Sequence, residues 1–242
     1  MIECGVHYNN RSGFTRAMQL ICNSESYYRP IYFSDEEKVN SRSGLISDNT
    51  AFEKFKAQNQ GGFFLLSDIV LYDLSNVNNS KFEISIFQLK SGIEHVFPEM
   101  FVKLSTTLPQ FAFACESEEY YHRNRLYFRF GKKEVEAWVG RSIEKYIPGI
   151  YWLTLLSKNY SKTHGLNLRS LIKKIQPEIL LENKDQLVLK IYPNSFAWKD
   201  HSPRINIVLE GSRSFFLKSV VENATRNVES TIELVKALKD WK

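Results

Sequence analysis

The side chains best suited to chemistry stand at the ends of two neighbouring apolar runs. Asp73 ends one run, the pair Gln88-x-Lys90 ends the next, and Glu83 lies within the second. Restriction-type nucleases place an acidic residue on one strand and an acid or Gln, then x-Lys, on the next; the acids hold Mg²⁺ and the Lys orients the attacking water. The pattern therefore indicates a Mg²⁺-dependent nuclease as one alternative. Two features count against it: Gln is a weaker metal ligand than a carboxylate, and Asp is common beside a hairpin loop for turn reasons alone.

Other catalytic or metal-binding patterns are weak in this chain. The five histidines stand more than five residues apart, and Glu118 with His122 would give only two ligands on one helix face. No G-x-S-x-G or glycine-rich phosphate loop occurs, and Cys115 sits in an apolar run that favours a buried, inert thiol. We therefore expect no catalytic residues, no metal and no cofactor, and the sequence favours a binding protein over an enzyme.

Composition describes an ordinary globular protein with an unusual share of aromatic residues. The 242 residues are 43% hydrophobic and 24% charged, enough for one large core or two small ones. The net charge of +5 is spread along the chain, so no nucleic acid is expected as partner. Aromatic residues make up 14%, and surface Tyr and Trp are frequent anchors of protein interfaces.

Cysteine usage and hydropathy predict a cytoplasmic location. The three cysteines are far apart and show no C-x-x-C spacing, as is typical of a reducing compartment. The first residues lack the basic and apolar regions of a signal peptide, and no apolar stretch approaches the roughly 18–20 residues of a membrane span. We therefore expect no membrane partner.

The periodicity predicts an α+β fold with mainly antiparallel sheet, because the strands come in hairpin-like pairs with helices at irregular intervals. The expected extended segments are residues 2–8, 27–33, 63–66, 69–74, 82–89, 111–115, 125–130, 134–139, 187–192 and 205–209. The expected helices are residues 14–22, 50–58, 98–107, 151–163, 168–175 and 216–239. We predict a single domain over residues 1–242, with a possible subdivision near 92–110.

The last predicted helix, residues 216–239, is long and amphipathic. Its apolar residues recur every three or four positions and form one stripe: Leu217, Val220, Val221, Ala224, Val228, Ile232, Val235 and Leu238. Such a stripe covers a sheet of the same chain more often than it binds a separate partner. We therefore expect this helix to be part of the core.

Aromatic residues surround a Pro-Gly corner directly after the hairpin at 125–139. Pro148 fixes its own φ and Gly149 is free to turn, while Tyr146, Tyr151 and Trp152 flank the corner. The block Trp138-Val139-Gly140-Arg141, followed by Tyr146-Ile147-Pro148-Gly149-Ile150-Tyr151-Trp152-Leu153, resembles a stretch in large α+β immunity proteins of bacterial polymorphic-toxin and type VI secretion systems. The resemblance covers about 15 residues. It implies stoichiometric inhibition: one cognate protein toxin is bound in the cytoplasm and its active site is occluded.

An inhibitor of this kind needs a rigid scaffold with a few aromatic anchors inside a polar rim. The residues predicted to contact the partner are an acidic triplet, a tyrosine pair and two aromatics of a late loop: Glu116, Glu118, Glu119, Tyr120, Tyr121, Phe196 and Trp198. The acidic triplet could face a basic cleft of the toxin. The activity of the toxin and the oligomeric state of this chain stay open.

Overall fold

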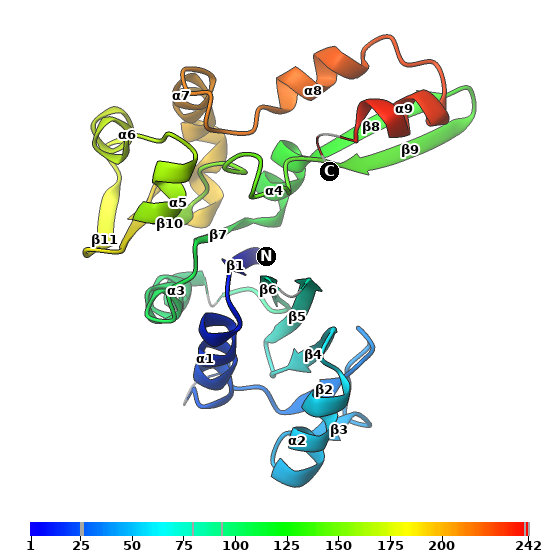
Figure 1. The fold of residues 1–242 in the computed structure, drawn as a ribbon, viewed down its shortest axis with the longest axis vertical. Helices are drawn as coiled ribbons and strands as arrows, with labels where there is room; N and C mark the ends of the chain where they lie inside the picture. Colours follow the sequence, from blue (N-terminus) through cyan, green and yellow to red (C-terminus); the bar gives the residue numbers. More distant parts are fainter. Residues whose placement is uncertain (25–26, 79, 93, 240, 242) are drawn as a thin grey trace.

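A computed structural model of the chain describes residues 1–24, 27–78, 80–92, 94–239 and 241. Within them, strands β1 Ile2–Tyr8, β2 Tyr32–Ser34, β3 Gly44–Leu45, β4 Gly62–Leu66, β5 Val70–Asn78, β6 Lys81–Gln88, β7 Phe111–Glu116, β10 Leu153–Ser157, β11 Glu178–Glu182 and β12 Gln186–Lys190 form one sheet. The strand order is β11-β12-β10-β7-β1-β6-β5-β4-β2-β3, and every neighbouring pair is antiparallel. Figure 1 shows this sheet running through the molecule from β11 at one end to β3 at the other. The predicted α+β class is confirmed.

Three helices cover one face of the N-terminal half of the sheet: α1 Arg11–Cys22, α2 Asn49–Gln58 and α3 Phe97–Ser105, the last preceded by the short 3₁₀ helix η1 Glu94–Val96. The side chains of Asn10 and Asp48 cap α1 and α2 by accepting hydrogen bonds from Gly13 N (2.8 Å) and Ala51 N (3.0 Å). The cap at Asp48 follows from its type and position, so the start of α2 was correctly predicted from the sequence.

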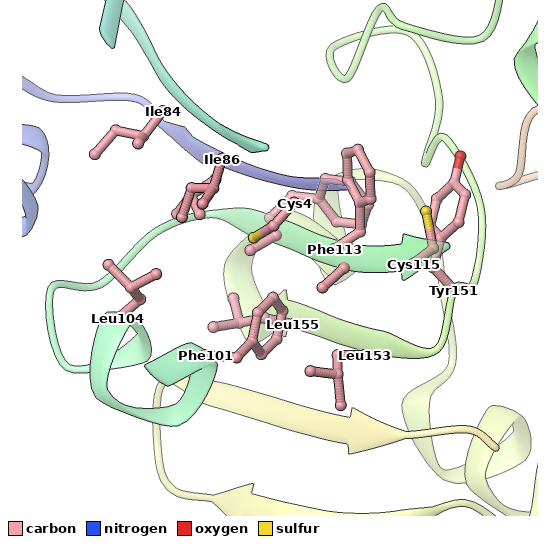
Figure 2. Packing of buried hydrophobic residues seen from close by; sticks show 14 of the residues in the cluster. Cys4, Ile84, Ile86, Phe101, Leu104, Phe113, Cys115, Tyr151, Leu153 and Leu155 are labelled. Atoms are coloured by element: carbon pink, nitrogen blue, oxygen red, sulfur yellow. The ribbon is translucent and has the colours of Figure 1, made fainter. Parts of the chain in front are cut away.

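The hydrophobic core on the helix-covered face of the sheet is formed by every second residue of its strands. Phe101 and Leu104 of α3 are buried and lie beside Leu155 of β10 (Figure 2). Phe113 of β7 extends to the opposite side of the strand, together with Cys115. Helix α3 therefore covers one face of the central strands, and the side chain of Phe113 lies on the other face.

The C-terminal half adds helices at the other end of the sheet and a separate hairpin. Helices α5 Lys158–Thr163, α6 Leu168–Ile175 and α7 Trp198–Glu210, with the 3₁₀ helix η2 Ser195–Ala197, surround β10 to β12. Helix α4 Ser117–Asn124 packs against β7 and β1. Strands β8 Arg125–Phe130 and β9 Lys133–Trp138 form a two-stranded sheet that projects from the body, and α8 Lys218–Thr225 and α9 Thr231–Ala237 lie beside it (Figure 1).

The predicted C-terminal helix is present as two helices instead of one long one. The chain leaves the helix after α8, and Ser230 starts α9 by accepting a hydrogen bond from Glu233 N (3.3 Å). Val221, Leu234 and Leu238 are buried in a small core with residues of β8 and β9. Of the predicted stripe, Val221 and Leu238 are buried against the projecting hairpin and Val228 packs partly against it. The other members of the C-terminal stripe do not form one buried face, since Val220, Ala224, Ile232 and Val235 are exposed.

Two further element predictions were wrong. The first half of residues 151–163 is strand β10 and not helix, because every residue from Leu153 to Leu156 is buried between neighbouring strands and such a run has no helical or strand period. The apolar run 205–209 belongs to α7 and not to a strand; Ile205, Val208 and Leu209 are buried at helical spacing, while Ile207 is exposed. Helix α4 and strands β3 and β11 were not predicted. The single domain and its possible subdivision near 92–110 stay predictions.

The described part of the chain was compared with the requirements for a membrane-spanning helix and for a reactive thiol. No helix there combines the length and apolar composition that a membrane span requires. The three cysteines are free thiols; Cys4 and Cys115 are buried, and burial raises the pKa of both. Burial also raises the pKa of Cys22 to about 11, so all three stay protonated at neutral pH.

Candidate functional site

One face of the sheet carries several polar side chains, most of them half-buried and His7 buried. We call it the open face, and it is made by the residues of β1, β5 and β6 that point away from α1: Glu3, His7, Leu71, Asp73, Ser75, Glu83, Ser85 and Phe87. The antiparallel register places Ser85 beside both Gly5 and Asp73. In the described residues no helix lies over this face at β4 to β6 (Figure 1). The face is therefore available to another molecule.

A groove runs along the open face where it meets α4 and the end of β9. Its first hollow has a volume of about 220 Å³, and its lining includes two carboxylates, a guanidinium and the rings of two tyrosines and a tryptophan: Glu3, Glu83, Arg141, Tyr120, Tyr121 and Trp138. We call these six residues the acid–aromatic groove. A second hollow of about 200 Å³ continues from it, shares Glu83 and Arg141, and adds His7, Lys81 and Glu144. Lys81 and Glu144 form an ion pair with each other.

The floor of the groove depends on a glycine. Gly5 pairs with Phe113 in the register of β1 and β7, and the Phe113 ring lies so close that a Cβ on Gly5 would be 2.6 Å from it. The ring of Phe113 is stacked on Tyr120, with centroids 5.3 Å apart and planes at 11°. Tyr120 in turn contacts Trp138 at 5.6 Å, and Trp138 meets Tyr121 edge-on at 5.5 Å. The aromatic wall is therefore one continuous packed cluster.

Helix α4 holds the tyrosines of the groove by means of a buried ion pair on its other side. Glu119 is fully buried and accepts hydrogen bonds from Arg123 Nε (3.0 Å) and the Tyr192 hydroxyl (2.8 Å). The guanidinium of Arg123 also lies 5.7 Å from the ring centroid of Tyr151. Burial raises the pKa of Glu119, and the charge of Arg123 opposes that shift. Because i and i+1 point to different sides of a helix, this anchor directs Tyr120 and Tyr121 toward the groove.

The groove and the neighbouring open face are acidic. Burial raises the pKa of Glu3, and burial with the nearby charge of Glu83 raises the pKa of Asp73. Burial lowers the pKa of His7 despite the neighbouring carboxylate of Glu83, 3.6 Å from His7 Nδ1, so His7 is neutral at pH 7. Among the described residues, Glu3 and Glu83 line the first hollow together with one Lys or Arg side chain, Arg141, and Asp73 adds a third carboxylate on the adjoining face.

The structure separates the residues that were predicted to contact a partner. Tyr120 and Tyr121 line the groove, and Tyr121 is 40% exposed. Each member of the acidic triplet has a partner within the chain: Glu116 accepts a hydrogen bond from the Trp198 indole (2.9 Å), Glu118 pairs with Lys199 (2.8 Å), and Glu119 with Arg123 (3.0 Å). Glu119 and Trp198 are buried, so their roles are structural in this conformation. Phe196 is exposed but does not line the groove. Contact of Glu116, Glu118 and Phe196 with a partner stays a prediction.

The nuclease pattern does not converge on one site. Asp73 and Glu83 lie on the open face, but Gln88 points to the opposite face, where its side chain accepts from Ile2 N (3.1 Å) and donates to the Lys90 carbonyl. Gln88 is thus a buried structural residue that fixes the ends of two strands. Among the residues that the structure describes, no three His, Cys, Asp or Glu side chains are placed to hold a metal ion.

Comparison with known proteins gives a structural likeness and no family. No protein-family model matches the chain, and no curated protein matches it. One solved structure, described as the Pseudomonas aeruginosa T6SS protein PA0821, is similar with a TM-score of 0.54 and 12% sequence identity; the match covers 88% of this chain and 73% of that chain. At this identity the likeness concerns the fold.

The buried anchor of α4 predicts a large difference between two adjacent glutamates. Glu119→Ala should lower the free energy of unfolding by about 3–5 kcal/mol, because it leaves the Arg123 guanidinium buried without its counter-charge. Glu118→Ala, which removes only an exposed ion pair, should change it by at most about 1 kcal/mol. Urea denaturation measures both variants. Equal small losses would show that the pair does not hold α4.

The raised pKa values predict that the acidic face costs stability at neutral pH. The pKa values of Glu3 and Asp73 are higher in the folded than in the unfolded protein. The folded protein therefore loses stability as the pH rises from the unfolded-state pKa to the folded-state pKa of each carboxyl. Glu3→Gln and Asp73→Asn should therefore increase the free energy of unfolding at pH 7, and the gain should vanish below about pH 4, near the unfolded values. Glu99→Gln is the control, since Lys103 lowers the pKa of Glu99 and the sign reverses. Denaturation curves at both pH values test this; a loss of stability at pH 7 in both variants contradicts it.

Proposed function

We propose that this protein is an immunity protein that binds one cognate bacterial toxin and occludes its active site. The observation that carries the proposal is the open face with its acid–aromatic groove: a half-buried polar surface on a sheet whose other face is covered by helices. Carboxylates whose pKa is raised by burial cost the protein stability at neutral pH. Neutral or fully hydrated side chains would keep this face soluble without that cost, so the carboxylates favour a role in binding. The fold likeness to a protein described as belonging to T6SS supports a place in the same kind of system.

The segment that resembles immunity proteins builds one wall of the groove. Trp138 and Arg141 belong to it and line the groove, while the Pro148-Gly149 corner that follows is buried. The corner is fixed by a hydrogen bond from the Tyr151 hydroxyl to Asn124 Oδ1 (2.9 Å). The resemblance therefore falls on the part of the chain that presents aromatic and charged side chains to the open face.

Binding by occlusion needs the features that this surface combines. Tyr, Trp and Arg are the side chains that most often carry the energy of protein interfaces, and Tyr121, Trp138 and Arg141 stand together here. The sheet and the anchored helix α4 hold them in place before binding, which reduces the entropy lost on association. The acidic charge of the face would accelerate association with a basic active-site cleft and weaken the binding of acidic proteins.

Co-expression with the product of the neighbouring gene tests the proposed function. We expect the chain to protect cells from that product and to elute with it as a stoichiometric complex. Tyr121→Ala and Glu83→Lys should each weaken the complex by about 2 kcal/mol or more, because they remove an anchor and reverse a charge of the groove. Glu99→Lys, an equal charge reversal on α3, should leave protection intact.

The proposal fails if cells are not protected and no complex forms. Protection without a complex would also contradict it, because occlusion requires one chain bound to each toxin molecule. If the complex forms but tolerates Tyr121→Ala and Glu83→Lys as well as Glu99→Lys, another surface of the protein is responsible.

A further inference from the structure

We infer that the acid–aromatic groove binds the cationic head of a Lys or Arg side chain that projects from a basic segment of the partner protein. This inference rests on the proposed function, since it takes the partner to be a protein. It assigns to the groove a chemical specificity that the open face as a whole does not define. The argument depends on four features of the groove: size, charge, ring geometry and the position of Arg141.

The size of the groove fits one long side chain. Its first hollow of about 220 Å³ is smaller than the roughly 300–1,000 Å³ of typical small-molecule sites. It is open along the sheet toward the second hollow, so the backbone of a bound segment could continue across His7 and Glu83. A single inserted side chain on an extended segment uses this shape better than a folded element would.

The charge of the groove is incompletely balanced by the chain itself. Glu3 and Glu83 line it, and among the described residues neither has a Lys or Arg nitrogen within 4.0 Å. The nearest basic side chain of Glu83 is His7, which is neutral at pH 7. Arg141 is the one Lys or Arg side chain among the described residues that line the first hollow beside these two carboxylates, and Asp73 adds a third carboxylate on the adjoining face. The register places Glu3 opposite Phe87 and Glu83 opposite His7, four positions apart along the strands, so a cation that enters the groove would meet the carboxylate at one end of it.

The aromatic wall already binds a guanidinium at its far side. Arg125 lies with its Cζ 5.0 Å from the ring centroid of Tyr121 and 5.8 Å from that of Trp138. Arg125 does not line the groove, whereas both rings do. Rings that hold one cation by their π-electrons offer the same attraction to a second cation inside the groove. Aromatic side chains next to carboxylates are the arrangement by which proteins recognise ammonium and guanidinium groups.

Substitution of Arg141 tests the inference, because a ligand-repelling role and a structural role predict opposite changes in binding affinity. It is exposed, lines both hollows and carries the same charge as the inferred ligand. Its guanidinium therefore opposes a second cation in the groove. Arg141→Gln should strengthen binding of a cationic ligand, although it removes a side chain from the site.

The experiment uses the full chain and a hexa-arginine peptide, with binding followed by isothermal titration and by the indole signals of the protein. We expect saturable binding that weakens as salt increases. Glu83→Gln and Tyr121→Ala should each weaken it about tenfold, and Arg141→Gln should tighten it several-fold. Glu99→Gln, which removes an exposed carboxylate on α3 outside the groove, is the matched control and should stay within about twofold of the wild type.

Three results would overturn the inference: no saturable binding of hexa-arginine, an unchanged affinity in Glu83→Gln, or equal binding of hexa-glutamate. None of them would affect the proposed function, which depends on protection and on the complex with the toxin. A toxin complex that forms normally in a protein that does not bind hexa-arginine would show that the immunity function holds and the cation site does not.

Discussion

The register of the antiparallel strands β5, β6, β1 and β7 is the constraint on which the rest of this structure depends. It sends Val6, Ile84 and Leu74 to one face, where α1 and α3 bury them, and sends Gly5, Ser85 and Asp73 to the other. Because side chains alternate with a period of two residues, a slip by one would bury the carboxylates and expose the core. The cost of that slip fixes the register, and the register in turn fixes the acidic surface.

The second constraint on the structure is an ion pair that is buried within the protein. Glu119 and Arg123 are buried together on α4 and share the hydroxyl of Tyr192, which comes from a segment far along the chain. This network ties α4 to the C-terminal half of the sheet, while Tyr120 on the next position packs on Phe113 of β7. One short helix thus joins an internal ionic anchor to an aromatic wall at the surface. A buried pair of this kind specifies position more than it adds stability.

The helices and strands were largely predictable from the sequence, whereas the residues that come together in the groove were not. Capped helices and hairpins, such as α2 after Asp48 and β8–β9, follow from turn chemistry and periodicity. The fully buried strand β10 gave no period, and the acidic triplet at Glu119 was taken for surface because burial of a charge needs a partner that lies elsewhere in the chain. The groove joins Glu3, Glu83 and Trp138, which are far apart in sequence. The alternation Leu71-x-Asp73-x-Ser75 and Glu83-x-Ser85 was the signal that could have marked the open face.

Hydrogen exchange of the chain alone and in complex with its toxin tests the central claim most directly. Binding at the open face should slow exchange of the backbone amides of β1, β5 and β6 and of the segment from Tyr120 to Arg141, since these line the groove and its surroundings. The amides of α1 and α2, on the covered face, should be unaffected. Protection confined to α1 and α2, with the open face exchanging as in the free protein, would contradict the account.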